Sequence, residues 1–330
     1  MSKFEYLLKH FVSAEEGRKA GIPGITGDEQ EFIPLSDFIR REREIISVEE
    51  PLGYDRETSR FKVENRLLAP RIQVLMWLMV DAVHDFFLED VCFESLDETK
   101  VVVSRWTLRP MFRDYSFTAK TPERVQSNMT SLATIFETAI LGSSSVQAPF
   151  EVTHLIQLMK GDAAPMLFLI RCHPCLVPLP NRPIYLSRMV SQAWGVTRWD
   201  DREGFEYVLR SLSFHENWDS WVAENTYLKR FYDGADEPYD PQGVRTGKPP
   251  AQELLRYIGK VPGYGKLCDA DSAYQSKDGR RRTPGWFIPT DVTRMIYSVT
   301  HTLLARMAES LQRLGQLRHT KVQSLFPGRE

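Results

Sequence analysis

The sequence has no apolar run long enough to cross a membrane. Its most apolar stretch, residues 70–89 (PRIQVLMWLMVDAVHDFFLE), has only residues 72–80 free of ionisable side chains. That is about half of the roughly 20 residues that a membrane-spanning helix needs. The first residues, MSKFEYLLKHF, lack the apolar run and the small-residue cleavage site of a signal peptide. We therefore expect no membrane partner.

Cysteine is also scarce. The four cysteines, Cys92, Cys172, Cys175 and Cys268, are too few to form a disulfide framework in a chain of 330 residues. This scarcity predicts a reducing compartment, and we expect a cytoplasmic protein.

The chain lacks a concentrated block of one charge. Its 42 Lys and Arg residues nearly balance 44 Asp and Glu, which gives a formal net charge of -2, and no long basic run is present. A protein whose main task is to neutralise nucleic-acid phosphates needs a concentrated cationic surface. The composition argues against that class and leaves only weak contact with RNA open.

The sequence does contain strong helical patterns. Pro70 suits the first turn of a helix, and the apolar residues of 70–89 cover nearly all faces, as in a helix buried at the centre of a core. Thr121 and Pro122 begin a second helix that Gly142 ends. Further helices are expected at residues 2–12, 37–46 (capped by Ser36), 150–160, 205–212, 218–232, 252–258 and 290–314, with strand-like runs at 101–108 and 166–172.

These patterns predict a mainly α fold: one large helical domain with a few short strands and long irregular loops, the alternative being α+β. We expect an N-terminal amphipathic helix and tether in residues 1–34, a helical half in 35–142 and a second half with long loops in 150–330. The two halves are expected to pack as one domain. Residues 142–149, GSSSVQAP, are the most linker-like composition inside the chain.

Cys172, His173 and Cys175 lie in a CxxC sequence with an internal histidine. A reactive cysteine pair of the thioredoxin type lies at a helix N-terminus, but the sequence LVPLP follows here and does not form a helix. A structural zinc site needs a second pair of ligands, and only Cys268 remains. We interpret the cysteines as buried thiols beside a proline-rich turn, with a redox or metal role as the less favoured alternative.

Acidic residues and one histidine gather at residues 200–219, namely Asp200, Asp201, Glu203, His215, Glu216 and Asp219. Helix capping and the helix dipole favour carboxylates at helix starts without any metal, and we prefer that interpretation. We predict His84 to be a core histidine, and His154 gives no better signal. Residues 261–266 lack the spacing of a phosphate-binding loop. The sequence thus predicts no catalytic residue, no cofactor site and no metal ligand.

Two sets of residues are candidates for surface contacts. The first is an interface set, formed by the N-terminal stripe and by two aromatic residues near the C-terminal third: Phe4, Leu7, Leu8, Phe11, Trp286 and Phe287. The second is a basic set that could contact RNA phosphates: Arg280, Arg281 and Arg282. The more ordinary interpretation of these arginines is pairing with Asp269 and Asp271.

Three functions remain open. The first is a self-assembling structural protein and homo-oligomer, because the chain is globular, nearly neutral, rich in Trp and Arg, and without a catalytic motif. In size and composition it is similar to the helical coat proteins of small double-stranded RNA viruses, a likeness that no motif carries and that would place the protein in a virion. The second is an enzyme that uses the 200–219 cluster. The third is a helical adaptor that binds a partner through the loops of residues 233–285.

Overall fold

The computed structural model describes residues 32–49, 65–113, 115–199, 201–212, 222, 254, 255, 258 and 302–326. The chain divides into two compact units, which are described separately. Unit 1 comprises residues 1–47 and 66–176, and unit 2 comprises residues 48–65 and 177–330. The fold is mainly helical, as the sequence predicts, with 66% of the described residues in helices. Within the described residues, no helix combines the length and apolar character that crossing a membrane requires.

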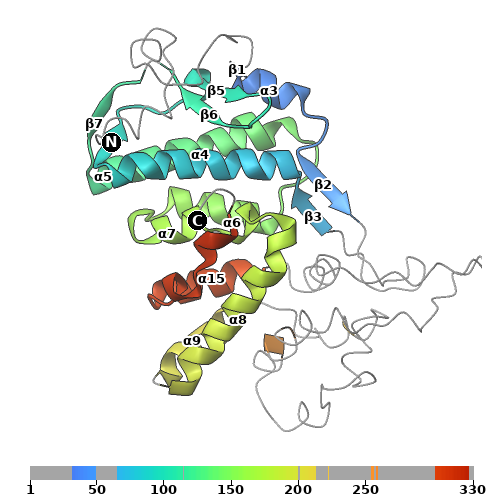
Figure 1. Cartoon of the computed structure of the whole chain (residues 1–330), viewed down its shortest axis with the longest axis vertical. Coiled ribbons are helices and arrows are strands. Elements are labelled where there is room, and N and C mark those ends of the chain that lie inside the picture. Colours follow the sequence, from blue (N-terminus) through green and yellow to red (C-terminus); the bar gives the residue numbers. More distant parts are fainter. Residues whose placement is uncertain are drawn as a thin grey trace, which may run out of the picture. The chain divides into compact units, whose positions relative to one another are not determined.

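Unit 1 contains most of the described elements (Figure 1). In chain order these are β1 (Phe32–Pro34), α3 (Leu35–Arg41), α4 (Pro70–Leu88), β4 (Val91–Phe93), η1 (Glu98–Lys100), β5 (Val101–Ser104), β6 (Pro110–Phe112), β7 (Phe117–Ala119), α5 (Pro122–Ile135), η2 (Phe136–Ile140), η3 (Leu141–Ser143), α6 (Phe150–Lys160), η4 (Ala164–Met166), α7 (Leu167–Arg171) and η5 (Pro174–Leu176). The strands β2 (Ile46–Glu49) and β3 (Asn65–Leu68) form a two-stranded sheet of their own.

Helix α4 is the centre of unit 1, as predicted. Pro70 is its first residue, and side chains on nearly every face are buried, among them Leu75, Met79 and Phe86 at 0% exposure. The helix contacts α5, α7, β4, β6 and η5, and Figure 1 shows it running beneath the β1–β5–β6 sheet. Phe86 meets the Phe93 ring edge to face at 4.7 Å, which joins the helix to strand β4.

The strands form short antiparallel sheets. In the three-stranded sheet, β5 lies between β1 and β6, with Val103 opposite Ile33 and Pro110. The predicted strand over residues 101–108 is therefore too long, because β5 ends at Ser104 and residues 105–107 form a turn. Pro110 begins the next strand, so the chain must reverse before it.

Helix α5 begins where the sequence predicts. The Thr121 hydroxyl accepts a hydrogen bond from the Arg124 amide at 3.3 Å, and Pro122 is the first helical residue. The last part of the predicted helix is a π-helical turn, Phe136–Ile140, followed by a 3-10 turn. This wider turn buries Ile140, whereas Ala139, which the predicted apolar stripe included, is only half-buried.

Two other local predictions are wrong. Helix α3 begins at Leu35 after Pro34 and ends at Arg41, so Ser36 is not its cap and Ile46 belongs to strand β2. The run 166–172 was predicted as a strand, but Met166 ends the 3-10 turn η4 and residues 167–171 form helix α7. A short apolar run has no periodicity that separates a strand from a buried helix, which explains the second error. Helix α6 has the predicted bounds, residues 150–160.

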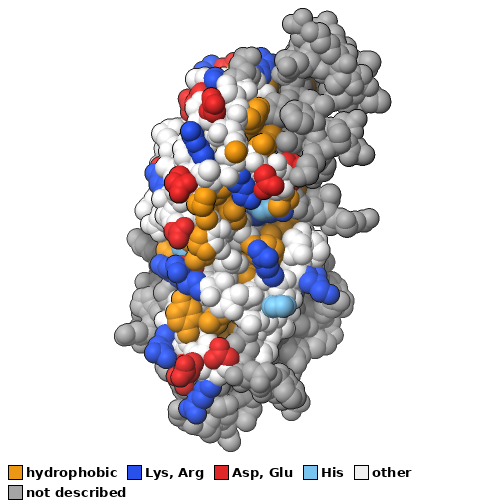
Figure 2. Space-filling model, turned by 90° about the vertical axis from the view of Figure 1, so that its left-hand side faces the viewer, with side chains coloured by type: hydrophobic (Ala, Val, Ile, Leu, Met, Phe, Trp, Pro, Cys, Tyr) orange, Lys and Arg blue, Asp and Glu red, His pale blue; other side chains and the backbone are white. Residues whose placement is uncertain are grey.

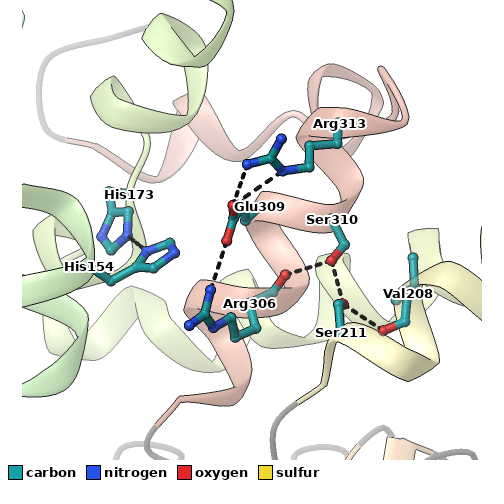
Figure 3. Close-up of polar contacts among 8 residues, drawn as sticks. All are labelled: His154, His173, Val208, Ser211, Arg306, Glu309, Ser310 and Arg313. Atoms are coloured by element: carbon teal, nitrogen blue, oxygen red, sulfur yellow. Dashed lines mark hydrogen bonds and ion pairs between the residues drawn. The ribbon is translucent and has the colours of Figure 1, made fainter. Parts of the chain in front are cut away.

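The described residues of unit 2 from 177 onward form helices and the turns between them, and residues 48, 49 and 65 are the ends of strands β2 and β3. Its elements are η6 (Leu179–Asn181), α8 (Arg182–Trp199), α9 (Arg202–Ser211), α15 (Leu303–Arg313), η7 (Leu317–Thr320) and η8 (Val322–Leu325). Helix α15 packs on α8 and α9 and buries the predicted stripe members Leu303, Met307 and Leu311. Its Ser310 hydroxyl contacts that of Ser211 on α9, as Figure 3 shows.

Candidate interaction site

The most concentrated chemistry in unit 1 is buried. His154 on α6 places its Nδ1 3.0 Å from the Nε2 of His173, and the His173 Nδ1 lies 3.1 Å from the Sγ of Cys175 (Figure 3 shows the two histidines). Gln73 on α4 donates a hydrogen bond from its Nε2 to the Cys175 carbonyl at 2.7 Å. The three side chains of this Cys–His–His cluster, Cys175, His173 and His154, are 1%, 0% and 3% exposed.

The hydrogen bonds of the Cys–His–His cluster determine its tautomers. The Cys175 amide donates to the His173 Nδ1 at 3.3 Å, so this nitrogen is an acceptor. The proton of neutral His173 is then on Nε2, which donates to the Nδ1 of His154. A thiol next to an imidazole that a third group orients is the arrangement of cysteine nucleophiles. Here a substrate could reach the sulfur only by opening the core, so we interpret the cluster as a satisfied polar network.

Cys172 lies in a different environment from Cys175. Burial raises the pKa of the Cys172 thiol, and the nearby Asp81 carboxylate raises it further. Asp81 itself accepts a hydrogen bond from the Arg171 Nε at 2.8 Å, and the other end of the Arg171 guanidinium lies 3.6 Å from the Asp85 carboxylate. A thiol with a raised pKa is a poor nucleophile, and both cysteines are buried as the sequence predicts.

The described members of the acidic cluster serve helix α9. Asp201 caps the helix, and its Oδ1 accepts the Gly204 amide at 2.8 Å. Glu203, the other described member, is exposed in the first turn of α9, where a carboxylate interacts favourably with the helix dipole. Glu206, which is not a member of the cluster, pairs with Arg202 and Arg210 on the same helix. Within the residues that the structure describes, no three or more His, Cys, Asp and Glu side chains are arranged to hold a metal ion.

The other predicted site residues lie outside the described part of the chain. They are Phe4, Leu7, Leu8, Phe11, Asp200, His215, Glu216, Asp219, Cys268, Asp269, Asp271, Arg280, Arg281, Arg282, Trp286 and Phe287. The predictions made for them stay predictions.

The structure reveals a surface feature that the sequence analysis missed. The turn between β5 and β6 presents Trp106, whose side chain is 77% exposed. Among the large apolar side chains of the described residues, this is the highest exposure. The turn is firmly built, because the Ser104 amide bonds to the Arg109 carbonyl and the Leu108 amide to the Ser104 carbonyl, both at 3.0 Å. Leu108 adopts a left-handed backbone with φ of 59° to close it.

The turn is also basic, and we call residues 105–109 the Trp106 tip. The Arg105 guanidinium lies 6.0 Å from the Trp106 ring centroid, at the outer limit of a cation–π contact. In the described part of the chain, Arg105 forms no ion pair. Arg71, near the start of α4, donates to the Arg105 carbonyl at 3.4 Å and pairs with Glu42 at 3.1 Å. The tip is thereby attached to the N-terminal end of the central helix.

A sequence signal for the Trp106 tip existed. Pro110 is disfavoured inside a central strand, which makes a chain reversal in the preceding RWTLR sequence a reasonable expectation. The exposure of Trp106 itself has no sequence signal, because tryptophan is enriched both in strands and at interfaces.

No family model matches this sequence, and no curated protein resembles it closely enough to count as related. The site must be interpreted from its own chemistry. A rigid turn that holds tryptophan beside arginine in solvent has the composition of an interaction hot spot.

Proposed function

We propose that this chain is a structural subunit that assembles with copies of itself. The observation that carries the proposal is the Trp106 tip, a tryptophan 77% exposed on a turn fixed by backbone hydrogen bonds. Exposing so large an apolar side chain in water is unfavourable, and tryptophan and arginine are the residues most enriched in interface hot spots.

A second exposed apolar side chain supports the proposal. Leu88, the last residue of α4, is 58% exposed. The tip is linked to the opposite end of the same helix through Arg71, and the two ends are separated by roughly 25 Å at the rise of an α-helix. Different contact points at the two ends of one helix let copies join head to tail, an arrangement that closes into rings or continues into larger assemblies.

One face of the molecule is mixed in character. Figure 2 shows one face of the molecule on which apolar side chains are interspersed with basic and acidic ones. Interfaces of this composition are specific because each charge needs an opposite partner, whereas a uniformly charged face would repel a second copy.

The test is the mass of the protein in solution, measured by light scattering after gel filtration over a hundredfold range of concentration. We expect oligomers whose fraction rises with concentration. A protein that stays monomeric up to its solubility limit contradicts the proposal.

The finer form of the proposal is a coat subunit of a small RNA virus. Negative-stain microscopy of the oligomer should then show closed shells, and RNA contact should be weak because the chain has a net charge of only -2. If microscopy shows open chains or discrete rings, self-assembly still holds but the coat-protein hypothesis is rejected. The alternative enzyme that uses residues 200–219 is less favoured, since Asp201 caps α9 and Glu203 lies in the first turn of that helix.

A further inference from the structure

We propose that the Trp106 tip of one copy docks on the carboxyl end of α4 in the next copy, which we call the Leu88 corner and define as Leu88, Glu89 and Asp90. This inference rests on the proposed self-assembly and specifies which two surfaces meet. Each surface consists of one exposed apolar side chain flanked by charges, and the two surfaces carry opposite charges.

The corner is apolar and acidic. Leu88 is 58% exposed, and the Asp90 carboxylate that follows it is 78% exposed. Asp90 adopts a left-handed backbone with φ of 59°, which turns the chain sharply into β4. The carbonyl end of the helix dipole adds partial negative charge to the same place.

One cation lies at the corner and is already engaged. Lys120 donates to the Phe87 carbonyl at 2.8 Å and lies 4.0 Å from Asp90. At that distance in solvent the pair is weak, so Asp90 is available to a guanidinium that approaches from another copy.

The tip has the complementary composition. Trp106 is flanked by Arg105, which forms no ion pair with any described residue, and by Arg109. The aromatic face of Trp106 would cover Leu88, while a guanidinium from the tip would meet the Asp90 carboxylate in a charge-assisted contact. The contact joins two different surfaces, so it can repeat from copy to copy in a closed ring or an open chain.

The first experiment compares apolar variants by sedimentation velocity, which gives the dissociation constant of the assembly. Trp106→Ala should raise this constant by about 30-fold or more, as hot-spot truncation does, and Leu88→Ala should raise it as well. The matched control is Tyr207→Ala, which removes an aromatic side chain that is 41% exposed in unit 2 and should leave the constant unchanged. If Tyr207→Ala weakens assembly while Trp106→Ala and Leu88→Ala do not, the proposal is overturned.

The second experiment exchanges the charges. Arg105→Glu alone and Asp90→Lys alone should each raise the dissociation constant by about tenfold, with a smaller effect at high salt. The double variant should recover most of the affinity, because a reversed tip then meets a reversed corner. A symmetric tip-to-tip contact predicts no such recovery and would overturn the proposal.

A third variant separates misfolding from lost binding. Asp90→Asn removes the charge but keeps a residue type that tolerates the left-handed backbone, so it should fold normally and still weaken assembly. If Asp90→Asn assembles like the unmodified protein, the corner is not the partner surface.

The outcomes also distinguish this inference from the proposed function. A monomer at every concentration refutes both. An oligomer that is insensitive to Trp106→Ala refutes only the tip-to-corner contact. Binding of a labelled single-stranded RNA that Arg105→Glu abolishes, while assembly persists, would assign the tip to nucleic acid and overturn the inference.

Discussion

The Nε2 of His173 lies 3.0 Å from the Nδ1 of His154, and both rings are enclosed in the core of unit 1. We expect His173→Ala to lower the free energy of unfolding by about 3 kcal/mol, because it leaves a cavity and takes a hydrogen-bond partner from both His154 and Cys175. Urea unfolding measures the change.

The control for this prediction is His319→Ala, a change at an exposed histidine that should cost less than about 0.5 kcal/mol. A double-mutant cycle with His154→Ala should give a coupling of about 1 kcal/mol between the two histidines. Strict additivity would show that the hydrogen bond contributes nothing.

Arg171 joins two carboxylates one helical turn apart on α4, Asp81 at 2.8 Å and Asp85 at 3.6 Å. Arg171→Met leaves the Asp85 carboxylate, which is 2% exposed, without this cation, so we expect a loss of about 3–5 kcal/mol of stability. Arg202→Met removes an exposed pair with Glu206 and should cost at most about 0.5 kcal/mol. Thermal unfolding of the two variants side by side tests the difference, and equal losses would contradict it.

The thiol of Cys172 makes the stability of the folded protein depend on pH in the alkaline range. Burial and Asp81 raise its pKa, so above pH 9 the unfolded chain releases the thiol proton while the folded chain retains it. Stability is therefore fully present below pH 9 and falls as the pH rises, by at most about 1.4 kcal/mol per pH unit from this group.

Cys172→Ala should reduce that alkaline slope, which urea unfolding between pH 8 and pH 10.5 can measure. Iodoacetamide should also leave the thiol of the folded protein unmodified at pH 8, because the thiolate is the reactive form. Rapid labelling of Cys172 in the native state would show that the environment is not as enclosed as its burial indicates.

Asp201 distinguishes capping from catalysis in the acidic cluster. Asp201→Ala removes the acceptor of the Gly204 amide and should cost about 1 kcal/mol, whereas Asp201→Asn keeps an oxygen in place and should be nearly neutral. Circular dichroism during thermal unfolding compares them. A large loss in both variants would point to a role for the charge beyond capping.

Helices α4 and α5 could be predicted because their signals are local. Pro70 with an apolar run, and Thr121 followed by Pro122, mark the beginnings of α4 and α5 through the backbone chemistry of the first turn. Helix α7 was assigned to the wrong class, since its short apolar sequence fits a buried strand equally well. Helix α8 was not predicted, because the prolines up to Pro183 obscured a helix that begins at Arg182.

The candidate sites depended on contacts between distant residues. His154 and His173 are 19 residues apart, and no pattern in the sequence indicates that their rings meet. Trp106 was expected within a strand, and only the tertiary structure shows that it lies on a turn in solvent. Exposure is a property of the packed chain, so a residue type alone cannot reveal it.

The π-helical turn at Phe136–Ile140 changes which side chains after α5 face the core. By accommodating one residue more than an α-turn, it carries the small Ala139 away from the core and delivers the larger Ile140 in its place. The turn thus shifts the register of buried side chains between α5 and the segment that leads to α6. A one-residue deletion there, unlike one in the middle of α4, could be absorbed by rewinding to a regular α-helix.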